Sequence, residues 1–63
     1  MIKTEDLKPG TRFRRNSDLA EMEIVKVENW SAYVRELKTG YLYHYGLGVL
    51  SRCGTTISKE GGR

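Results

Sequence analysis

The sequence predicts a single, mostly β domain: a small, strongly bent antiparallel sheet or small barrel of about five strands, with a short N-terminal helical turn. The chain has 63 residues, which are too few to form two hydrophobic cores. Its apolar residues recur mainly at the period of two that strands require. No segment keeps a helical spacing for long enough to form a stable α-helix alone. Turn-forming residues separate the apolar runs at short intervals, as in small all-β folds.

The N-terminal segment predicts a helical turn, a tight corner and then a strand. Acidic residues within 4–7 favour one helical turn, because they lie near its positive end. Pro9 presets the first angle of a turn and Gly10 accepts the positive φ that follows, so the chain leaves this corner as a strand. In that strand, residues 11–15, Phe13 is the only large apolar residue, and the arginines on either side of it share the opposite face.

The second predicted strand, residues 21–27, contains a change of phase. Met22 and Ile24 alternate regularly with polar residues, whereas Val25 and Val27 continue the alternation one position out of step. A shift of one residue is what a β-bulge produces, and bulges bend strands where a small sheet must curve. We therefore expect a bulge in this strand.

A third strand over residues 30–37 and a fourth that begins at residue 41 predict a hairpin. Lys38-Thr39-Gly40 fits a three-residue loop, which is a type I turn closed by a glycine in the left-handed conformation. This register makes three cross-strand pairs and places all six residues on one face: Tyr33 with Tyr45, Arg35 with Tyr43, and Leu37 with Tyr41. The other face then carries Ala32, Val34, Glu36, Leu42 and His44.

The C-terminal part predicts one more element and then a tail. Gly46 and Gly48 interrupt the pattern, so residues 47–50 form either a short turn of helix or a final strand. From residue 54 onward the composition is small, polar and rich in glycine, which is typical of a flexible tail. We therefore assign residues 1–53 to one small β domain and residues 54–63 to the tail.

Three segments carry a resemblance to a known group of folds: Leu7-Lys8-Pro9-Gly10-Thr11-Arg12-Phe13, the strand from Met22 to Val27, and Leu37-Lys38-Thr39-Gly40-Tyr41. Together they resemble SH3-like small barrels, the group that includes Tudor and KOW domains. The resemblance covers residues 4–50 as an architecture. The chain departs from Tudor domains in lacking an obvious aromatic cage, and from KOW domains in lacking their full glycine and charge pattern. It is also similar in size and style to short accessory proteins of bacteriophages and mobile elements.

Charge and cysteine content limit the partners and the compartment. Eleven Lys and Arg against eight Asp and Glu give a net charge of +3, which raises the encounter rate with nucleic acid without selecting it over an acidic protein surface. Cys53 is the only cysteine, so no internal disulfide can form and no Cys/His cluster exists to bind a metal. A lone thiol and the lack of a secretory leader predict a cytoplasmic protein, and no apolar run is long enough to cross a membrane.

The sequence also lacks the residue sets that catalysis and cofactor binding use. Acid–base or nucleophilic catalysis needs a nucleophile, a base and an orienting group around a pocket. His44 is the only histidine and lies nine positions from Cys53. Gly46 and Gly48 indicate a turn rather than a phosphate-binding loop, because a strand–loop–helix context is missing. We expect a protein that is not an enzyme and that has no cofactor.

One group of residues combines positive charge with flat aromatic rings and is the candidate binding site. Guanidinium groups neutralise phosphates, and aromatic rings on a sheet stack with unpaired bases, each stack contributing roughly 1–3 kcal/mol. Alternatively, the tyrosines stabilise the sheet itself, where cross-strand pairs contribute about 0.2–1 kcal/mol each. Because a buried arginine needs a partner, a row with Arg35 in its middle predicts partial exposure. The candidate residues are Arg12, Arg14, Arg15, Lys26, Arg35, Tyr33, Tyr41, Tyr43 and Tyr45.

Two other side chains have predicted positions. Trp30 directly follows a turn, where it either caps the core or projects from it. A domain this small needs its largest side chain inside, so we expect Trp30 to be buried. We expect His44 at the edge of the core, with a hydrogen bond to its ring.

Two functions fit these residues. The first is nucleic-acid binding through the basic and aromatic sheet face, with bases stacking on Tyr41 and Tyr43. The alternative is a protein-interaction adaptor or inhibitor, of the phage accessory type, that docks on a host protein through the same aromatic face. Glutamates between positions 21 and 28 would favour a protein partner if they flank the arginines. The small core also predicts a homo-oligomer that forms through an exposed sheet edge.

Overall fold

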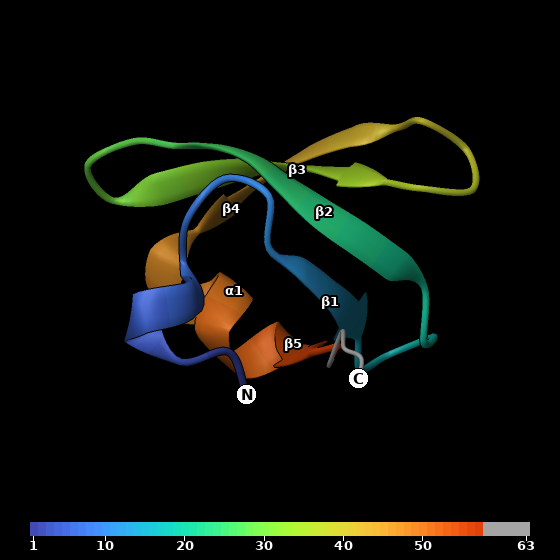
Figure 1. Cartoon of the computed structure of the whole chain (residues 1–63), viewed down its shortest axis with the longest axis horizontal. Coiled ribbons are helices and arrows are strands. Elements are labelled where there is room, and N and C mark those ends of the chain that lie inside the picture. Colours follow the sequence, from blue (N-terminus) through green and yellow to red (C-terminus); the bar gives the residue numbers. More distant parts are fainter. Residues whose placement is uncertain (58–63) are drawn as a thin grey trace.

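The computed structural model describes residues 1–57, which form one five-stranded antiparallel sheet and a short helix (Figure 1). The strand order is β4-β3-β2-β1-β5, so β4 and β5 are the edges of a sheet that is not closed within the described residues. No helix in this part of the chain is long and apolar enough to span a membrane. The elements are the 3-10 turn η1 (Thr4–Asp6), β1 (Arg12–Arg15), β2 (Glu21–Val27), β3 (Ser31–Glu36), β4 (Leu42–Gly46), α1 (Leu47–Cys53) and β5 (Gly54–Thr56).

The mostly β fold, with about five strands and an N-terminal helical turn, is confirmed. Of the two predicted forms of residues 47–50, the helix is the one observed, because they begin α1. In Figure 1 the strands β2, β3 and β4 cross above α1, while β1 and β5 lie beside and below them. The sheet therefore curls around the helix without forming a complete barrel.

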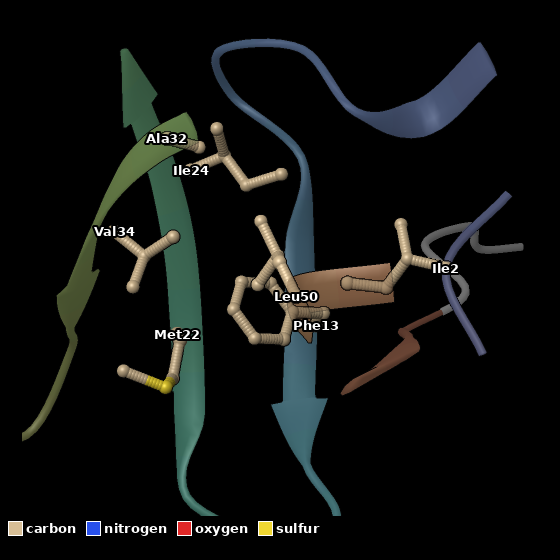
Figure 2. Close-up of a cluster of buried hydrophobic side chains, with 7 residues drawn as sticks. All are labelled: Ile2, Phe13, Met22, Ile24, Ala32, Val34 and Leu50. Carbon is tan, nitrogen blue, oxygen red and sulfur yellow. The ribbon is translucent and has the colours of Figure 1, made fainter. Parts of the chain in front are cut away.

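The hydrophobic core lies between the inner face of the sheet and α1 (Figure 2). Seven side chains, each no more than 1% exposed, form it: Ile2, Phe13, Met22, Ile24, Ala32, Val34 and Leu50. Ile2 is anchored to α1 by two hydrogen bonds of 2.9 Å, one from its N–H to Ser51 O and one from Ser51 Oγ to its carbonyl oxygen. A helix of seven residues is not stable alone, so α1 depends on Leu50 and on these contacts.

The predicted bulge and the predicted turn glycines are confirmed. The β2–β3 register shifts between Ile24 and Lys26, which leaves Val25 without a partner on β3 and 46% exposed. Gly10 and Gly40 have φ angles of 95° and 80°, which are in the left-handed region that favours glycine. These features depend on the chemistry of one or two residues, and the sequence predicts them well.

The register of the β3–β4 hairpin differs from the prediction by one residue. Glu36, not Leu37, lies opposite Tyr41, because Glu36 N donates to Tyr41 O at 2.8 Å. Gly40 N donates to Glu36 O at 2.8 Å, which closes a loop that includes Leu37. The N–H of Leu37 instead donates to Glu21 O of β2 at 3.0 Å. Leu37 is thus withdrawn from the hairpin, and the loop is one residue longer than predicted.

This shift divides the predicted aromatic row between the two faces of the sheet, because a slip of one residue moves every side chain of a strand to the other side. The inner face, with the core, carries Ala32, Val34, Glu36, Tyr43 and Tyr45, and the outer face carries Tyr33, Arg35, Leu42 and His44. The prediction that Tyr33, Arg35, Tyr43 and Tyr45 share one face is therefore wrong.

Trp30 is exposed, although the sequence predicts burial. Trp30 is 84% exposed in the turn between β2 and β3. A 2.7 Å bond from Glu28 N to Ser31 O closes this turn, and a 2.8 Å bond from Leu47 N, the first residue of α1, to Trp30 O holds it against the helix. The backbone of this turn is tied to α1, while the indole ring projects into solvent. Phe13 and smaller side chains already fill the core, so the largest side chain is not needed there.

Residues 54–56 form β5, although the sequence predicts a tail from residue 54 onward. β5 pairs with β1 in antiparallel register, and Gly54 is buried. A Cβ atom at Gly54 would lie 2.5 Å from Phe13 Cδ2, so glycine lets β5 approach the core closely. The small residue that suggested a tail has a packing role. The rest of the predicted tail, residues 58–63, lies outside the described residues.

Candidate interaction surfaces

The outer face of the sheet carries four of the predicted cations, together with glutamates. Three ion pairs form there, each with an N–O distance of 3.3 Å: Arg14 with Glu21, Arg35 with Glu23, and Lys26 with Glu28. Arg12 makes no ion pair within the described part of the chain. Solvent-accessible pairs of this kind add little to stability, but they make the surface mixed in sign rather than uniformly basic.

Tyr33 and His44 form a stacked pair on the same outer face. Their ring centroids are 4.3 Å apart and the ring planes differ by 7°. His44 Nε2 lies 2.8 Å from Ser31 Oγ, which fixes the imidazole beside β3. Lys26 lies opposite Tyr33 on β2, so a positive charge borders the stacked rings. His44 has the predicted hydrogen bond, but on the solvent side of the sheet.

Arg15 lies on the inner side and contacts the remaining tyrosines. Its guanidinium makes two hydrogen bonds to Asp18, of 2.9 and 2.7 Å, and a third of 3.4 Å to the hydroxyl of Tyr45. The same group lies 5.1 Å from the ring centroid of Tyr43, a cation–π distance. Tyr43 also stacks on Tyr45 at 6.1 Å and meets Tyr41 edge-on at 6.3 Å.

This arrangement gives Arg15 a structural role. β1 and β4 are separated by β2 and β3 in the sheet, yet Arg15 of β1 reaches Tyr43 and Tyr45 of β4. The guanidinium therefore links two strands across the open side of the sheet. The hydrogen bond with Asp18 raises the pKa of Arg15 above its ordinary value, so the group stays charged. Arg15, Tyr43 and Tyr45 thus already contact one another in the structure without a ligand.

We expect the Arg15–Asp18 pair to make the stability of the fold depend on pH in the acid range. The hydrogen bond from Arg15 and that from the N–H of Ala20 lower the pKa of Asp18 from 3.8 to about 2. The pKa of Asp18 is lower in the folded than in the unfolded state. The pair therefore makes its full contribution to the free energy of unfolding above about pH 4, and this contribution is lost as the pH falls towards 2. In Arg15→Gln the pKa of Asp18 should rise towards 3.8, as measured by NMR titration. Arg14→Gln is the control, and an unchanged Asp18 pKa in Arg15→Gln would contradict the assignment.

The structure does not join His44 and Cys53 into a reactive pair. His44 is on the outer face, bonded to Ser31, whereas Cys53 ends α1 and lines a shallow depression with Arg15 and Tyr45. Within residues 1–57, no group of three or more His, Cys, Asp or Glu side chains is placed to hold a metal ion.

The hairpin tip between β2 and β3 is the surface that sequence reasoning missed. Trp30 is the most exposed of the large apolar side chains described. The ion pair between Lys26 and Glu28 lies next to it in the chain, so both signs of charge border the indole. The signal in the sequence was the position of Trp30 directly after the turn dipeptide Glu28-Asn29.

The predicted site is therefore divided into two sets. Tyr33, Arg12, Arg14, Lys26 and Arg35 share the outer face, whereas Arg15, Tyr41, Tyr43 and Tyr45 gather at the inner side of β4. Comparisons with protein-family models, with curated proteins and with solved structures found no match to this chain.

Proposed function

We propose that the chain is a protein-interaction module, an adaptor or inhibitor that docks on another protein through the Trp30 hairpin tip and the adjoining outer face. The observation that carries this proposal is the 84% exposure of Trp30. Tryptophan is among the residues most enriched at binding hot spots, where a few anchors supply most of the affinity. The Leu47–Trp30 hydrogen bond already fixes the backbone at this residue, so only the side chain of Trp30 has to be ordered on binding.

The charge pattern of the outer face supports a protein partner. Glutamates lie 3.3 Å from the outer-face cations Arg14, Arg35 and Lys26. A phosphate backbone would meet these carboxylates together with the cations, and the like charges would repel. A protein surface can offer both signs of charge in a matching arrangement. The partner we propose has an apolar pocket for the indole, with a mixed-charge rim around it.

We expect Trp30→Ala to abolish capture of the partner and to leave the fold intact. Loss of a hot-spot anchor weakens binding by about 2 kcal/mol or more, roughly 30-fold. Loss of an exposed side chain changes stability by about 0.5 kcal/mol or less. The measurement is a nuclease-treated pull-down, with a photo-crosslinking amino acid at position 30 to identify the partner.

The matched control is Leu19, which is 66% exposed in the turn at the other end of β2. Leu19→Ala should retain the partner, and a crosslinker at position 19 should not label it. Capture that disappears with nuclease treatment, or that survives in Trp30→Ala, would contradict the proposal.

Nucleic-acid binding is the second candidate, and the Tyr33–His44 stack favours it. The two stacked rings offer a flat platform for a base. Lys26 borders them, and Arg12, which makes no ion pair within the described residues, lies on the same face. The net charge of the protein is +3. Titration of a labelled oligonucleotide at two ionic strengths tests it. Binding that weakens steeply with salt and is lost in Tyr33→Ala would support it, and no binding at low salt would exclude it. For either partner, the lone Cys53 supports the cytoplasm as the proposed compartment.

A further inference from the structure

β4 is an edge strand whose outward hydrogen-bonding groups have no partner within the described residues. Within these residues β4 is bonded on one side only, to β3, and the pairing is flanked by the bonds from Glu36 N to Tyr41 O and from Leu47 N to Trp30 O. Since alternate residues of an antiparallel strand bond to the same neighbour, the odd-numbered residues of β4 face β3. The backbone N–H and C=O groups of Leu42 and His44 and the N–H of Gly46 therefore point away from the sheet.

This edge lacks the features that normally prevent one sheet from pairing with another. Residues 41–46 read Tyr-Leu-Tyr-His-Tyr-Gly and contain no Lys, Arg, Asp, Glu or Pro. The β3–β4 register runs from Ser31 to Arg35 without a bulge that would twist the edge away. Exposed edges in monomers usually carry charges, prolines or bulges for this purpose. β4 is thus an uncharged, regular template for another strand.

We propose that β4 pairs with β4 of a second copy of this chain, in antiparallel orientation around a twofold axis at His44. In this register His44 lies opposite His44 of the second copy, and the two exchange both of their backbone hydrogen bonds. Leu42 lies opposite Gly46 of the second copy, so a larger side chain meets the smallest residue. The two sheets then continue into one sheet of ten strands, twice the five of each chain.

The same register is complementary on the inner face. Tyr43 lies opposite Tyr45 of the second copy, which extends the stack that these two residues make within one chain. Cross-strand aromatic pairs of this kind stabilise a sheet. In a dimer with a twofold axis, both copies contribute the same surface patch to the interface. A short segment that is complementary to itself is therefore sufficient to form a closed dimer.

The charge of the edge segment and the lengths of the two edge strands favour β4 of a second copy over other partners for this edge. Two chains of net charge +3 repel each other, and the uncharged segment 41–46 is a strip on which they can meet without opposing like charges. The other edge, β5, has three residues against the five of β4, so pairing β4 with β5 of a neighbour would form fewer bonds. The Trp30 tip lies in a different turn, so the dimer does not depend on the proposed function.

Sedimentation and amide exchange over a wide concentration range test this pairing. We expect a monomer–dimer equilibrium in which the amides of His44 and Gly46 exchange more slowly as concentration rises, by about tenfold when about nine-tenths of the chains are paired. The amides of Tyr43 and Tyr45 bond to β3 and should not respond. A protein that stays monomeric at high concentration, or that forms oligomers larger than a dimer, would overturn the proposal.

Two altered chains make the test specific to β4. H44K places two like charges opposite each other at the axis and should be monomeric, whereas V25K adds the same charge at the exposed bulge of β2 and should dimerise like the wild type. Because H44K also loses the Tyr33 stack, a synthetic chain with an N-methyl group on the His44 backbone is the second variant. It keeps the side chain, removes only the outward N–H, and should be a folded monomer. Dimers of unchanged strength in either variant would contradict the register.

Discussion

Phe13→Ala should lower the free energy of unfolding by about 3–5 kcal/mol, the largest loss expected from any single substitution considered for this protein. Phe13 is 1% exposed and belongs to a core of seven buried apolar side chains within residues 1–57. Removing a buried phenylalanine ring costs about 3–5 kcal/mol, because apolar contacts are lost and a cavity remains. A chain of this length has a total free energy of unfolding of about 3–9 kcal/mol. The substitution therefore removes a large part, and at the lower end all, of the stability.

Far-ultraviolet circular dichroism in urea measures this effect. Phe13→Leu keeps most of the volume and should retain a cooperative transition at a lower midpoint, whereas Leu19→Ala, at a site 66% exposed, should leave the midpoint within error of the wild type. If Phe13→Ala unfolded at the wild-type midpoint, the ring could not be the centre of the core.

Gly54→Ala should destabilise the protein by about 1–3 kcal/mol, although a single methyl group is added. Its Cβ would lie 2.5 Å from Phe13 Cδ2 and 2.8 Å from Ile2 Cδ1, so the ring or β5 must move. The φ of Gly54 is −124°, which any residue adopts, so the effect arises from lack of space and not from backbone strain.

Gly48→Ala provides the matched control. Gly48 lies within α1, and the nearest atom to a new Cβ is the flexible Arg52 Nη1 at 3.9 Å. Alanine is favoured over glycine in a helix by about 0.8–1.0 kcal/mol, so this variant should be more stable than the wild type. Urea midpoints of the two variants should move in opposite directions. In an Ile2→Ala background, Gly54→Ala should cost less, because one of the two opposing groups is gone.

Those parts of the fold that depend on one or two neighbouring residues could be predicted from the sequence. The positive φ of Gly10 and Gly40 and the bulge at Val25 follow from turn chemistry and from a change of phase. The hairpin register could not be predicted in this way. It depends on whether Leu37 pairs with Tyr41, which is four positions later, or its N–H bonds to Glu21 of β2, which is 16 positions earlier. The contact that forms is the more distant one, and the local turn pattern carries no information about it.

The candidate site was only partly predictable for the same reason. Alternation along β1 correctly placed Arg12 and Arg14 on one face. To predict which cation pairs with which glutamate, one needs the registers of three strands. To predict the position of Trp30, one needs to know which side chains fill the core. The composition around Gly54 predicts a tail, because the residue that restricts the space at Gly54 is Phe13, 41 positions earlier.

The exposure of Trp30 decides which spectroscopic signals report on this protein. Its single indole already faces water in the native state, so its emission maximum should sit at long wavelength and change little on heating. In a thermal melt the wavelength of the tryptophan emission maximum would then stay nearly constant, while the backbone signal shows the transition. The same emission should shift to shorter wavelength when a partner covers the ring, so the chain carries its own reporter of complex formation and not of unfolding.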